Sequence, residues 1–324
     1  MIELYNEDNK DLMARLPNES IDVICIDPPY LYLKNQKLER PFDEKLFFSE
    51  CKRLLPTNGF IVMFGRGESF YRWNTMLSDL GFTFKEEIVW DKTMNSIPAA
   101  PILRVHELVN IYSKKNGKLN AVRVPYLEAK NQNVDSIIQD LKRIKSAINS
   151  KEFEDIEHFL TTGNIKYTEK KSRNFFKNAF GERSRGLATL RTIQNGMKEK
   201  TIINELRDHY SAIHPTPKPV RLLERLLALV IPDKPKNEIM VADFFGGSFS
   251  TMEAVFNMGM NGISCEIDKE YFEAGKQRIE SLQPNLFSSE LKKSKGLEKL
   301  YRITVSQLDA VGDLEIRIYH LNTK

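Results

Sequence analysis

Short apolar runs alternate with amphipathic segments along the first 114 residues of the chain. The runs are rich in β-branched and aromatic residues, and we predict a strand at each of 21–26, 60–64, 84–90 and 105–112. Helical spacing of apolar residues predicts helices at 46–55 and 70–80, and a strand with a short helix is expected before residue 21. This alternation predicts an α/β fold with a doubly wound, mainly parallel sheet.

The same alternation resumes at His214, after a long polar stretch that is mostly helical in pattern. Here we predict three helices and two strands, the helices at 220–229, 252–258 and 271–282 and the strands at 239–245 and 262–265. Alternating residues from 300 to 319 then predict a small hairpin.

The predicted organisation is therefore one α/β core in two halves with an insert between them. The halves are 1–114 and 210–285, the insert is 115–209, and residues 286–324 form a C-terminal extension. We find no internal repeats.

The composition is that of an ordinary globular protein, with 324 residues, 41% hydrophobic and 28% charged. No apolar run approaches membrane-spanning length, and the first residues lack the order of a signal peptide. Cys25, Cys51 and Cys265 are widely separated, and the five histidines have no metal-ligand spacing with them. We therefore expect reduced core cysteines, no metal site and no membrane contact, in a cytoplasmic protein.

Positive charge gathers in the second half of the insert, although the whole chain carries only +4. Glu169, Glu182 and Glu199 oppose a much larger basic set, namely Lys166, Lys170, Lys171, Arg173, Lys177, Arg183, Arg185, Arg191, Lys198 and Lys200. Aromatic residues are interleaved with this set at Tyr167, Phe175, Phe176 and Phe180. A solvated helical face is the common explanation of such a run. Basic residues mixed with aromatics fit a nucleic-acid surface better, and we predict DNA contact here.

The strand at 21–26 leads directly into Asp27-Pro28-Pro29-Tyr30. Both prolines lack an N–H and fix φ, so the strand ends and leaves Asp27 at its carboxyl edge, where open α/β sheets bind ligands. The Asp27 carboxylate and the Pro28 carbonyl can accept hydrogen bonds from one exocyclic amine, while Tyr30 stacks on the ring that carries it. For a lone Asp-Pro, an ordinary turn at the end of a strand is the simpler explanation, and the full tetrapeptide shifts the balance toward the chemical use.

A second candidate site follows the strand at 239–245, where Gly246-Gly247-Ser248 joins it to a helix. Glycines let the backbone approach a ligand, and the N–H groups of the following helix point toward it. Glu266 ends the next strand, where an acidic side chain binds ribose hydroxyls in nucleotide-binding α/β units. The three-glycine spacing of a dinucleotide site and the lysine of a phosphate loop are absent, so a small nucleoside cofactor fits best.

Together, these motifs resemble the β group of S-adenosylmethionine-dependent amino-DNA methyltransferases. In that family the catalytic motif comes first, a target-recognition insert second and the cofactor motif last, so residues 1–114 correspond to the catalytic half and 210–285 to the cofactor-binding half. The resemblance implies a Rossmann-like methyltransferase sheet with this circularly permuted order. It also assigns the catalytic motif to Asp27, Pro28, Pro29 and Tyr30.

The same resemblance implies S-adenosylmethionine as cofactor and a set of residues that bind it. The segment at 213–219 would lie against its methionine part, Glu266 would bind its ribose and Asp8 would face its adenine. Trp90-Asp91-Lys92 and His106-Glu107 also resemble family segments, with no role assigned to them. The implied cofactor-binding set is Asp8, His214, Pro215, Thr216, Lys218, Asp243, Phe245, Gly246, Gly247, Ser248 and Glu266.

The implied reaction is methyl transfer to an exocyclic amine of a base flipped out of double-stranded DNA. Asp rather than Ser at position 27 favours adenine N6, by resemblance to the family. Cytosine N4 and an RNA amine are the alternative targets. Phe249 stands where the family loop has a second glycine; its ring either narrows the methionine channel or packs beneath the helix. The first outcome would make the chain a degenerate DNA-binding scaffold.

Double-stranded DNA is the expected partner, with a homodimer and a cognate restriction enzyme as further candidates. Gln283-Pro284-Asn285-Leu286-Phe287 also resembles the short peptides that dock on bacterial sliding clamps. The interpretation we favour is that Leu286 and Phe287 pack against the preceding helix, as chain reversals after helices often do.

Overall fold

The fold is given by a computed structural model. The structure describes residues 1–30, 40–92, 102–131, 133–148, 185–206, 217–282, 301–308 and 313–320. The chain divides into two units, Met1–Ile279 and Glu280–Lys324.

The first unit is built on an eight-stranded sheet in the order β1-β10-β9-β2-β3-β5-β4-β8. All of its neighbouring strands pair in parallel except β5, which runs antiparallel to both β3 and β4. The predicted mainly parallel sheet is therefore confirmed, with one reversed strand. In sheet order the strands are β1 (Ile2–Tyr5), β10 (Asn261–Cys265), β9 (Met240–Asp243), β2 (Val23–Ile26), β3 (Phe60–Gly65), β5 (His106–Ser113), β4 (Thr83–Asp91) and β8 (Ile202–Asn204).

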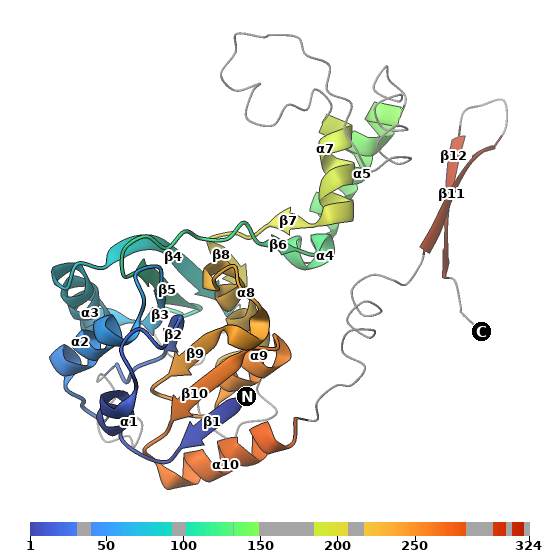
Figure 1. Ribbon diagram of the computed structural model, residues 1–324. Coiled ribbons are helices and arrows are strands. Elements are labelled where there is room, and N and C mark those ends of the chain that lie inside the picture. The colour runs from blue at the N-terminus through green and yellow to red at the C-terminus, as the bar shows by residue number, and fades with distance from the viewer. Residues whose placement is uncertain are drawn as a thin grey trace. The chain divides into compact units, whose positions relative to one another are not determined.

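Helices cover both faces of this sheet, as a doubly wound fold requires (Figure 1). Successive residues of a buried strand point to opposite faces. In β2, Val23 and Cys25 belong to the core on one face, while Ile24 and Ile26 belong to the core on the other. The first core also contains residues of α8 (Val220–Val230), α9 (Ser250–Asn257) and α10 (Lys269–Glu280), and the second contains residues of α1 (Asn9–Arg15), α2 (Glu44–Leu54) and α3 (Gly67–Asp79).

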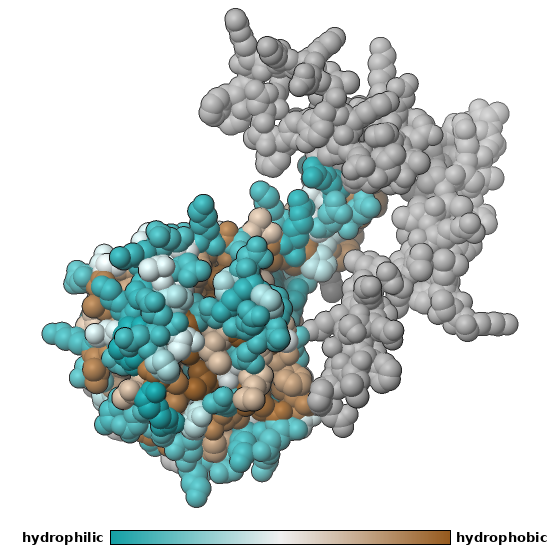
Figure 2. All heavy atoms as spheres, viewed as in Figure 1, coloured by the Kyte–Doolittle hydropathy of each residue, from teal (hydrophilic) through white to brown (hydrophobic). Residues whose placement is uncertain are grey.

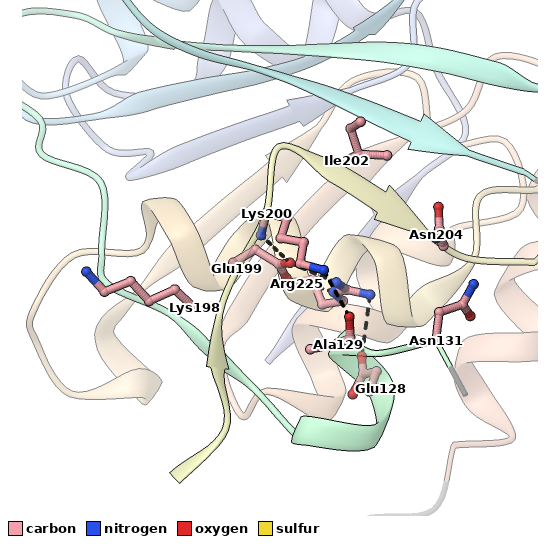
Figure 3. Close-up of a pocket in the computed structure, with 9 residues that line it drawn as sticks. All are labelled: Glu128, Ala129, Asn131, Lys198, Glu199, Lys200, Ile202, Asn204 and Arg225. Carbon is pink, nitrogen blue, oxygen red and sulfur yellow. Dashed lines mark hydrogen bonds and ion pairs between the residues drawn. The ribbon is translucent and has the colours of Figure 1, made fainter. Parts of the chain in front are cut away.

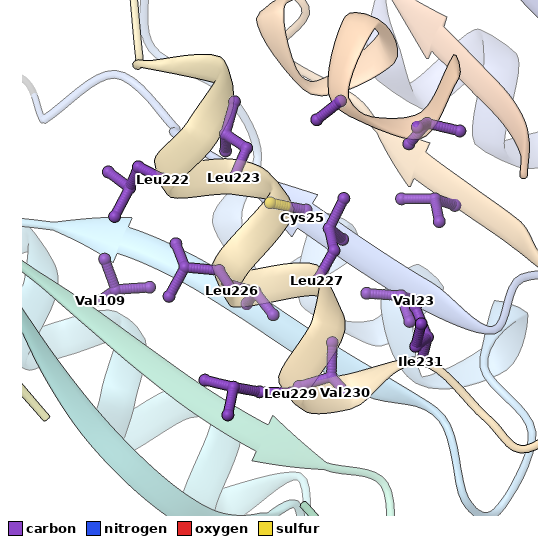
Figure 4. Packing of buried hydrophobic residues seen from close by; sticks show 14 of the residues in the cluster. Val23, Cys25, Val109, Leu222, Leu223, Leu226, Leu227, Leu229, Val230 and Ile231 are labelled. Carbon is purple, nitrogen blue, oxygen red and sulfur yellow. The ribbon is translucent and has the colours of Figure 1, made fainter. Parts of the chain in front are cut away.

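Helix α8 shows how the sequence specifies this packing. It begins after Pro219, whose fixed φ suits a helix start, and its leucines line the face that meets β2 and β5 (Figure 4). Leu222 and Leu226 are fully buried in the same core as Val23 and Val109. Each buried leucine contributes about 1.5–3 kcal/mol, so this face holds the helix on the sheet. Lys218, just before the helix, is thereby fixed at the edge of the sheet.

The insert is mostly helical within the residues that the structure describes. It contains α4 (Tyr126–Ala129), α5 (Val134–Ile148) and α7 (Arg185–Asn195), with a two-stranded ribbon of β6 (Arg123–Val124) and β7 (Met197–Lys198). The range predicted for the insert, 115–209, also includes β8, which the structure places in the central sheet beside β4. The basic residues from 166 to 183 lie outside the described residues.

The second unit contains an antiparallel hairpin of β11 (Tyr301–Leu308) and β12 (Asp313–His320). This confirms the hairpin predicted from the alternating residues between 300 and 319. The peptide from Gln283 to Phe287 lies outside the described residues, so the clamp-docking interpretation stays a prediction.

Two predictions from composition can be compared with the structure. Cys25, Cys51 and Cys265 are all buried free thiols, which confirms them as reduced core residues. Figure 2 shows polar and charged side chains over most of one face of the molecule, with hydrophobic residues between them. Within the described parts of the chain, no helix has the length and apolar character needed to cross a membrane.

Candidate active site

Four acidic residues follow the carboxyl ends of neighbouring parallel strands. Asp27 follows β2, Asp243 ends β9, Glu266 follows β10 and Asp8 lies three residues beyond β1. Because β1, β10, β9 and β2 run in the same direction, these residues lie along one edge of the sheet. This is the edge at which open α/β sheets bind ligands. The predicted catalytic and cofactor motifs are thus brought to the same side of the core.

The Asp27 carboxylate is held by the motif's own tyrosine. The Tyr30 hydroxyl donates a hydrogen bond to Asp27 Oδ1 at 2.5 Å, and Ser69 Oγ donates to the Tyr30 carbonyl oxygen at 2.7 Å. The Tyr30 ring lies 6.2 Å from the Trp73 ring, centroid to centroid. Pro28 is buried, whereas Asp27 and Tyr30 are partly exposed. A stiff, anchored turn therefore presents a carboxylate and an aromatic ring together.

Lys218 contacts the same carboxylate from the other half of the chain. Its Nζ lies 2.5 Å from Asp27 Oδ2 and 3.0 Å from Glu107 Oε2. The resemblance predicted a contact between Lys218 and the cofactor, and the structure places its ammonium group on the carboxylate of Asp27. His214, Pro215 and Thr216, which were predicted with it, lie outside the described residues.

Glu107 continues this chain of charges away from Asp27. Lys92 Nζ donates a hydrogen bond to Glu107 Oε1 at 2.9 Å, and both side chains are buried. Burial would raise the pKa of Glu107, but the ammonium groups of Lys218 and Lys92 hold it well below its ordinary value. Burial would likewise lower the pKa of Lys218, and the carboxylates of Asp27 and Glu107 raise it above its ordinary value instead.

Lys92 and Glu107 were not predicted as site residues. Lys92 follows β4 and Glu107 lies near the start of the antiparallel β5, so both reach the edge that carries Asp27. The signals available in the sequence were the resemblance of 90–92 and 106–107 to family segments and the acidic Glu107 in an otherwise mostly apolar strand. They could not show that the two segments pair, because the direction of β5 is a tertiary property.

The predicted cofactor loop lies between β9 and α9. The Gly247 N–H donates to Glu266 Oε2 at 2.8 Å, and the Asp268 N–H donates to Oε1 at 2.7 Å. Gly247 has a φ of 53°, which favours glycine. Burial raises the pKa of Glu266, while these two N–H groups oppose the shift. The loop is therefore folded directly against Glu266, at the start of a helix.

The residues fit a nucleoside cofactor. Each Glu266 oxygen still has a second lone pair after accepting one N–H, so the carboxylate can accept from ribose hydroxyls. A Cβ on Gly246 would lie 2.3 Å from Phe249 Cε1, so glycine is needed for the loop to take this shape. Asp8 caps α1, where it accepts the Lys10 N–H at 3.0 Å. The place of Asp8 beside adenine stays a prediction.

Phe249 points into the core. Its side chain is fully buried and its ring lies 5.9 Å from the Phe272 ring in an edge-to-face arrangement. A Cβ on Gly275 would lie 2.6 Å from Phe249 Cδ2, so the ring fills space left by glycines on both sides. Of the two placements considered from the sequence, packing beneath the helix is the one observed. The ring gives no reason to regard the chain as a degenerate scaffold.

Asp243 is buried beside the loop and accepts the Phe245 N–H at 3.0 Å. Burial raises its pKa from 3.8 to about 7. A raised native pKa means that the folded state binds the proton more tightly than the unfolded chain does. We therefore expect Asp243 to favour folding fully below about pH 4 and to lose that contribution as the pH rises through 7.

Asp243→Asn should remove this pH dependence, because the amide stays neutral and can still accept the Phe245 N–H. The measurement is the urea unfolding free energy of both proteins at several pH values from 5 to 8. The advantage of the variant over the original chain should grow with pH. Parallel curves for the two proteins would contradict the assignment.

A pocket elsewhere on the first unit joins the insert to the core (Figure 3). It is lined by Glu128, Ala129, Asn131, Lys198, Glu199, Lys200, Ile202, Asn204 and Arg225. None of these belongs to the predicted catalytic or cofactor-binding residues, and Lys198 and Lys200 belong to the basic set predicted to contact DNA. Arg225 is buried, and its Nε lies 2.7 Å from Glu199 Oε2. Its Nη1 lies 3.5 Å from Glu128 Oε1. These ion pairs tie the insert to helix α8, which also positions Lys218.

Comparison with known proteins agrees with the motifs on the family of the chain. Residues 21–277 match the family model described as DNA methylase. The chain is 24% identical over 313 residues to Type II methyltransferase M.HinfI of Haemophilus influenzae, covering 87% of this chain and 71% of that protein. It is 25% identical over 284 residues to DNA adenine methyltransferase YhdJ of Escherichia coli strain K12, covering 83% and 79%.

A solved structure has the same fold. The PvuII DNA methyltransferase, described as cytosine-N4-specific, superposes with a TM-score of 0.53 at 15% identity. The superposition covers 92% of this chain and 93% of that one. At this identity the likeness concerns the fold alone.

Proposed function

Because the chain belongs to the DNA methylase family, we propose that it methylates the N6 amine of adenine in DNA, with Asp27 as the residue that holds the amine. One observation carries this proposal. The Asp27 carboxylate lies at the edge of the sheet that also presents the Gly246–Ser248 loop and Glu266, with Tyr30 fixed beside it. A site for the amine and a site for a nucleoside cofactor thus open on the same edge.

S-adenosylmethionine is the cofactor, and when bound it supplies an activated methyl group. In the proposed site the loop from Gly246 to Ser248 and the carboxylate of Glu266 hold it. The loop approaches closely because Gly247 has a backbone conformation that favours glycine, and Glu266 is kept in place by two backbone N–H groups.

The chain's own residues prepare the target amine. The lone pair of an exocyclic amine is delocalised into the ring, which makes the nitrogen a poor nucleophile. Hydrogen bonds from the amine to Asp27 and to the Pro28 carbonyl would draw the nitrogen toward tetrahedral geometry and free that lone pair. Tyr30 would stack on the base once it has left the duplex. Since Pro28 and Pro29 fix the turn, the carboxylate needs little rearrangement when the base arrives.

Adenine is favoured over cytosine by the aspartate at position 27 and by one of the two relatives. YhdJ is described as a DNA adenine methyltransferase. The fold itself does not choose between the two bases, because the PvuII enzyme that shares it is described as cytosine-N4-specific.

Of the basic residues predicted to contact DNA, the structure describes the side chains of Arg191, Lys198 and Lys200.

The reaction can be tested by incubating the chain with unmethylated DNA and S-adenosylmethionine and then digesting the DNA to nucleosides. We expect N6-methyldeoxyadenosine to accumulate in proportion to the protein added. N4-methyldeoxycytidine in its place would correct the target base. No methylated nucleoside at all would overturn the proposed activity.

Glu266→Ala should weaken S-adenosylmethionine binding by about 1.5–3 kcal/mol, because a hydrogen bond to a charged group is lost. This corresponds to roughly a 10- to 150-fold increase in the dissociation constant measured by calorimetry. DNA affinity should change little, since Glu266 belongs to the predicted cofactor site, where it accepts the Gly247 N–H of the loop. Glu238→Ala is the matched control, because Glu238 is exposed just before β9, at the opposite edge of the sheet. An unchanged dissociation constant for the Glu266 variant would contradict its role.

A further inference from the structure

Four charged side chains form a continuous chain of ion pairs at the edge of the sheet. Asp27 pairs with Lys218, Lys218 pairs with Glu107, and Glu107 pairs with Lys92, at 2.5, 3.0 and 2.9 Å. The side chains of Lys218, Glu107 and Lys92 are only 10%, 7% and 3% exposed. Burying such charges is costly unless each has a partner, and the alternation of signs supplies one.

Two aromatic rings lie close to the ammonium group of Lys218. Its Nζ lies 5.0 Å from the centre of the Phe64 ring and 5.8 Å from that of Trp90, which are distances at which an aromatic face attracts a cation. The backbone of Lys218 lies between Pro217 and Pro219, and helix α8 begins immediately afterwards. Lys218 therefore reaches Asp27 from a stiff segment and with little conformational freedom to lose.

The contacts on Asp27 divide between its two oxygens. Tyr30 donates to Oδ1 and Lys218 contacts Oδ2. Each carboxylate oxygen can accept a second hydrogen bond, so the amine of a base can still bind there. The orientation of the carboxylate is thus set before any base arrives.

We propose that Lys218, anchored by Glu107 and Lys92, is a positioning residue that holds the Asp27 carboxylate in the orientation that receives the target amine. This inference rests on the proposed function of Asp27, gives Lys218 a role other than the predicted cofactor contact, and extends to Glu107 and Lys92, which had no role assigned. A positioning residue and a cofactor contact affect different measured quantities, the first the rate of methyl transfer and the second the affinity for the cofactor. Loss of Lys218 should slow methyl transfer without weakening S-adenosylmethionine binding, because fixed charges at the reacting amine act on the rate.

The decisive comparison is between the rate of methyl transfer and the dissociation constant in the same variants. For Lys218→Met, we expect the single-turnover rate at saturating S-adenosylmethionine and DNA to fall at least about tenfold. The dissociation constant for S-adenosylmethionine, measured by calorimetry, should stay within about threefold. Lys218→Arg keeps the positive charge and should recover a substantial part of the lost rate. Glu107→Gln, which removes the anchor but leaves Lys218 in place, should slow the reaction by a smaller factor at the same dissociation constant.

Lys234→Met is the matched control. Lys234 Nζ lies 2.8 Å from Asp22 Oδ2, at the other end of the segment that carries β2. Lys234→Met therefore removes a lysine–aspartate ion pair far from the proposed site. Its rate should stay within about twofold of that of the unmodified chain. An equally slow control would overturn the inference, because any lost ion pair would then have the same effect.

The remaining outcomes separate the inference from the proposed function. Failure of the unmodified chain to methylate DNA would overturn both. An active unmodified chain with Lys218→Met within twofold of its rate would overturn the inference alone. So would a rise in the dissociation constant for S-adenosylmethionine well beyond about threefold, because Lys218 would then be a cofactor contact. If Lys218→Met does not fold, Glu107→Gln decides, and a rate within twofold of the unmodified chain overturns the inference.

Discussion

Asp27→Ala is expected to lower the single-turnover rate of methyl transfer at least about a hundredfold, which corresponds to ~2.7 kcal/mol of transition-state stabilisation. The carboxylate is the only acceptor in the motif that carries a negative charge, and it is held in place by Tyr30 and Lys218. S-adenosylmethionine should still bind, because the cofactor loop and Glu266 belong to other segments. The measurements are methyl incorporation into DNA in a single turnover and cofactor binding by calorimetry.

Asp27→Asn tests the charge separately from the shape of the side chain. The amide can still accept a hydrogen bond, but it neither attracts Lys218 nor polarises the amine as strongly, so we expect a large loss of rate here too. Asp22→Asn is the matched control, because Asp22 accepts the Met240 N–H at 2.8 Å and pairs with Lys234 at the opposite end of the same strand. A rate for Asp27→Ala within about tenfold of that of the unmodified chain would contradict the catalytic assignment.

Phe249→Ala is expected to reduce the free energy of unfolding by about 3–5 kcal/mol, the usual loss when a fully buried phenylalanine is truncated. The ring fills the space between Gly246 and Gly275, and neither glycine can supply atoms to replace it. Alanine gains little in return, because φ at this position is 54° and only glycine adopts such a value without cost. Urea unfolding followed by circular dichroism measures the effect.

Tyr71→Ala is the control for this prediction. Tyr71 is 75% exposed on α3, and its truncation should change stability by no more than about 0.5 kcal/mol. A loss below about 1 kcal/mol for Phe249→Ala would show that its ring does not support the core. If Phe249→Ala weakens cofactor binding without any loss of stability, the result would favour the other placement considered from the sequence, in which the ring narrows the methionine channel.

The order of elements in the core follows from local chemistry and was predicted from the sequence. The apolar run at 60–64 is β3, Phe60–Gly65, and the amphipathic segment at 46–55 is α2, Glu44–Leu54. The spacing of apolar residues is a local property, so helices and strands can be predicted from it without knowledge of the fold. The direction of β5 is different, because the run at 105–112 predicts a strand equally well whether it pairs in parallel or antiparallel. The same applies to β8, three residues long, which joins the sheet only because β4 is there to pair with it.

Local chemistry in the chain sets where the two motifs end their strands. Prolines 28 and 29 cannot continue a strand and Gly247 favours the turn, so Asp27 and the cofactor loop were placed at strand ends from the chain alone. Which residues meet at those strand ends depends on the tertiary packing. Lys218 and Asp27 come from opposite halves of the chain, and Glu107 reaches them because β5 is reversed. Such contacts depend on how distant elements pack, and no periodicity or spacing within one segment encodes them.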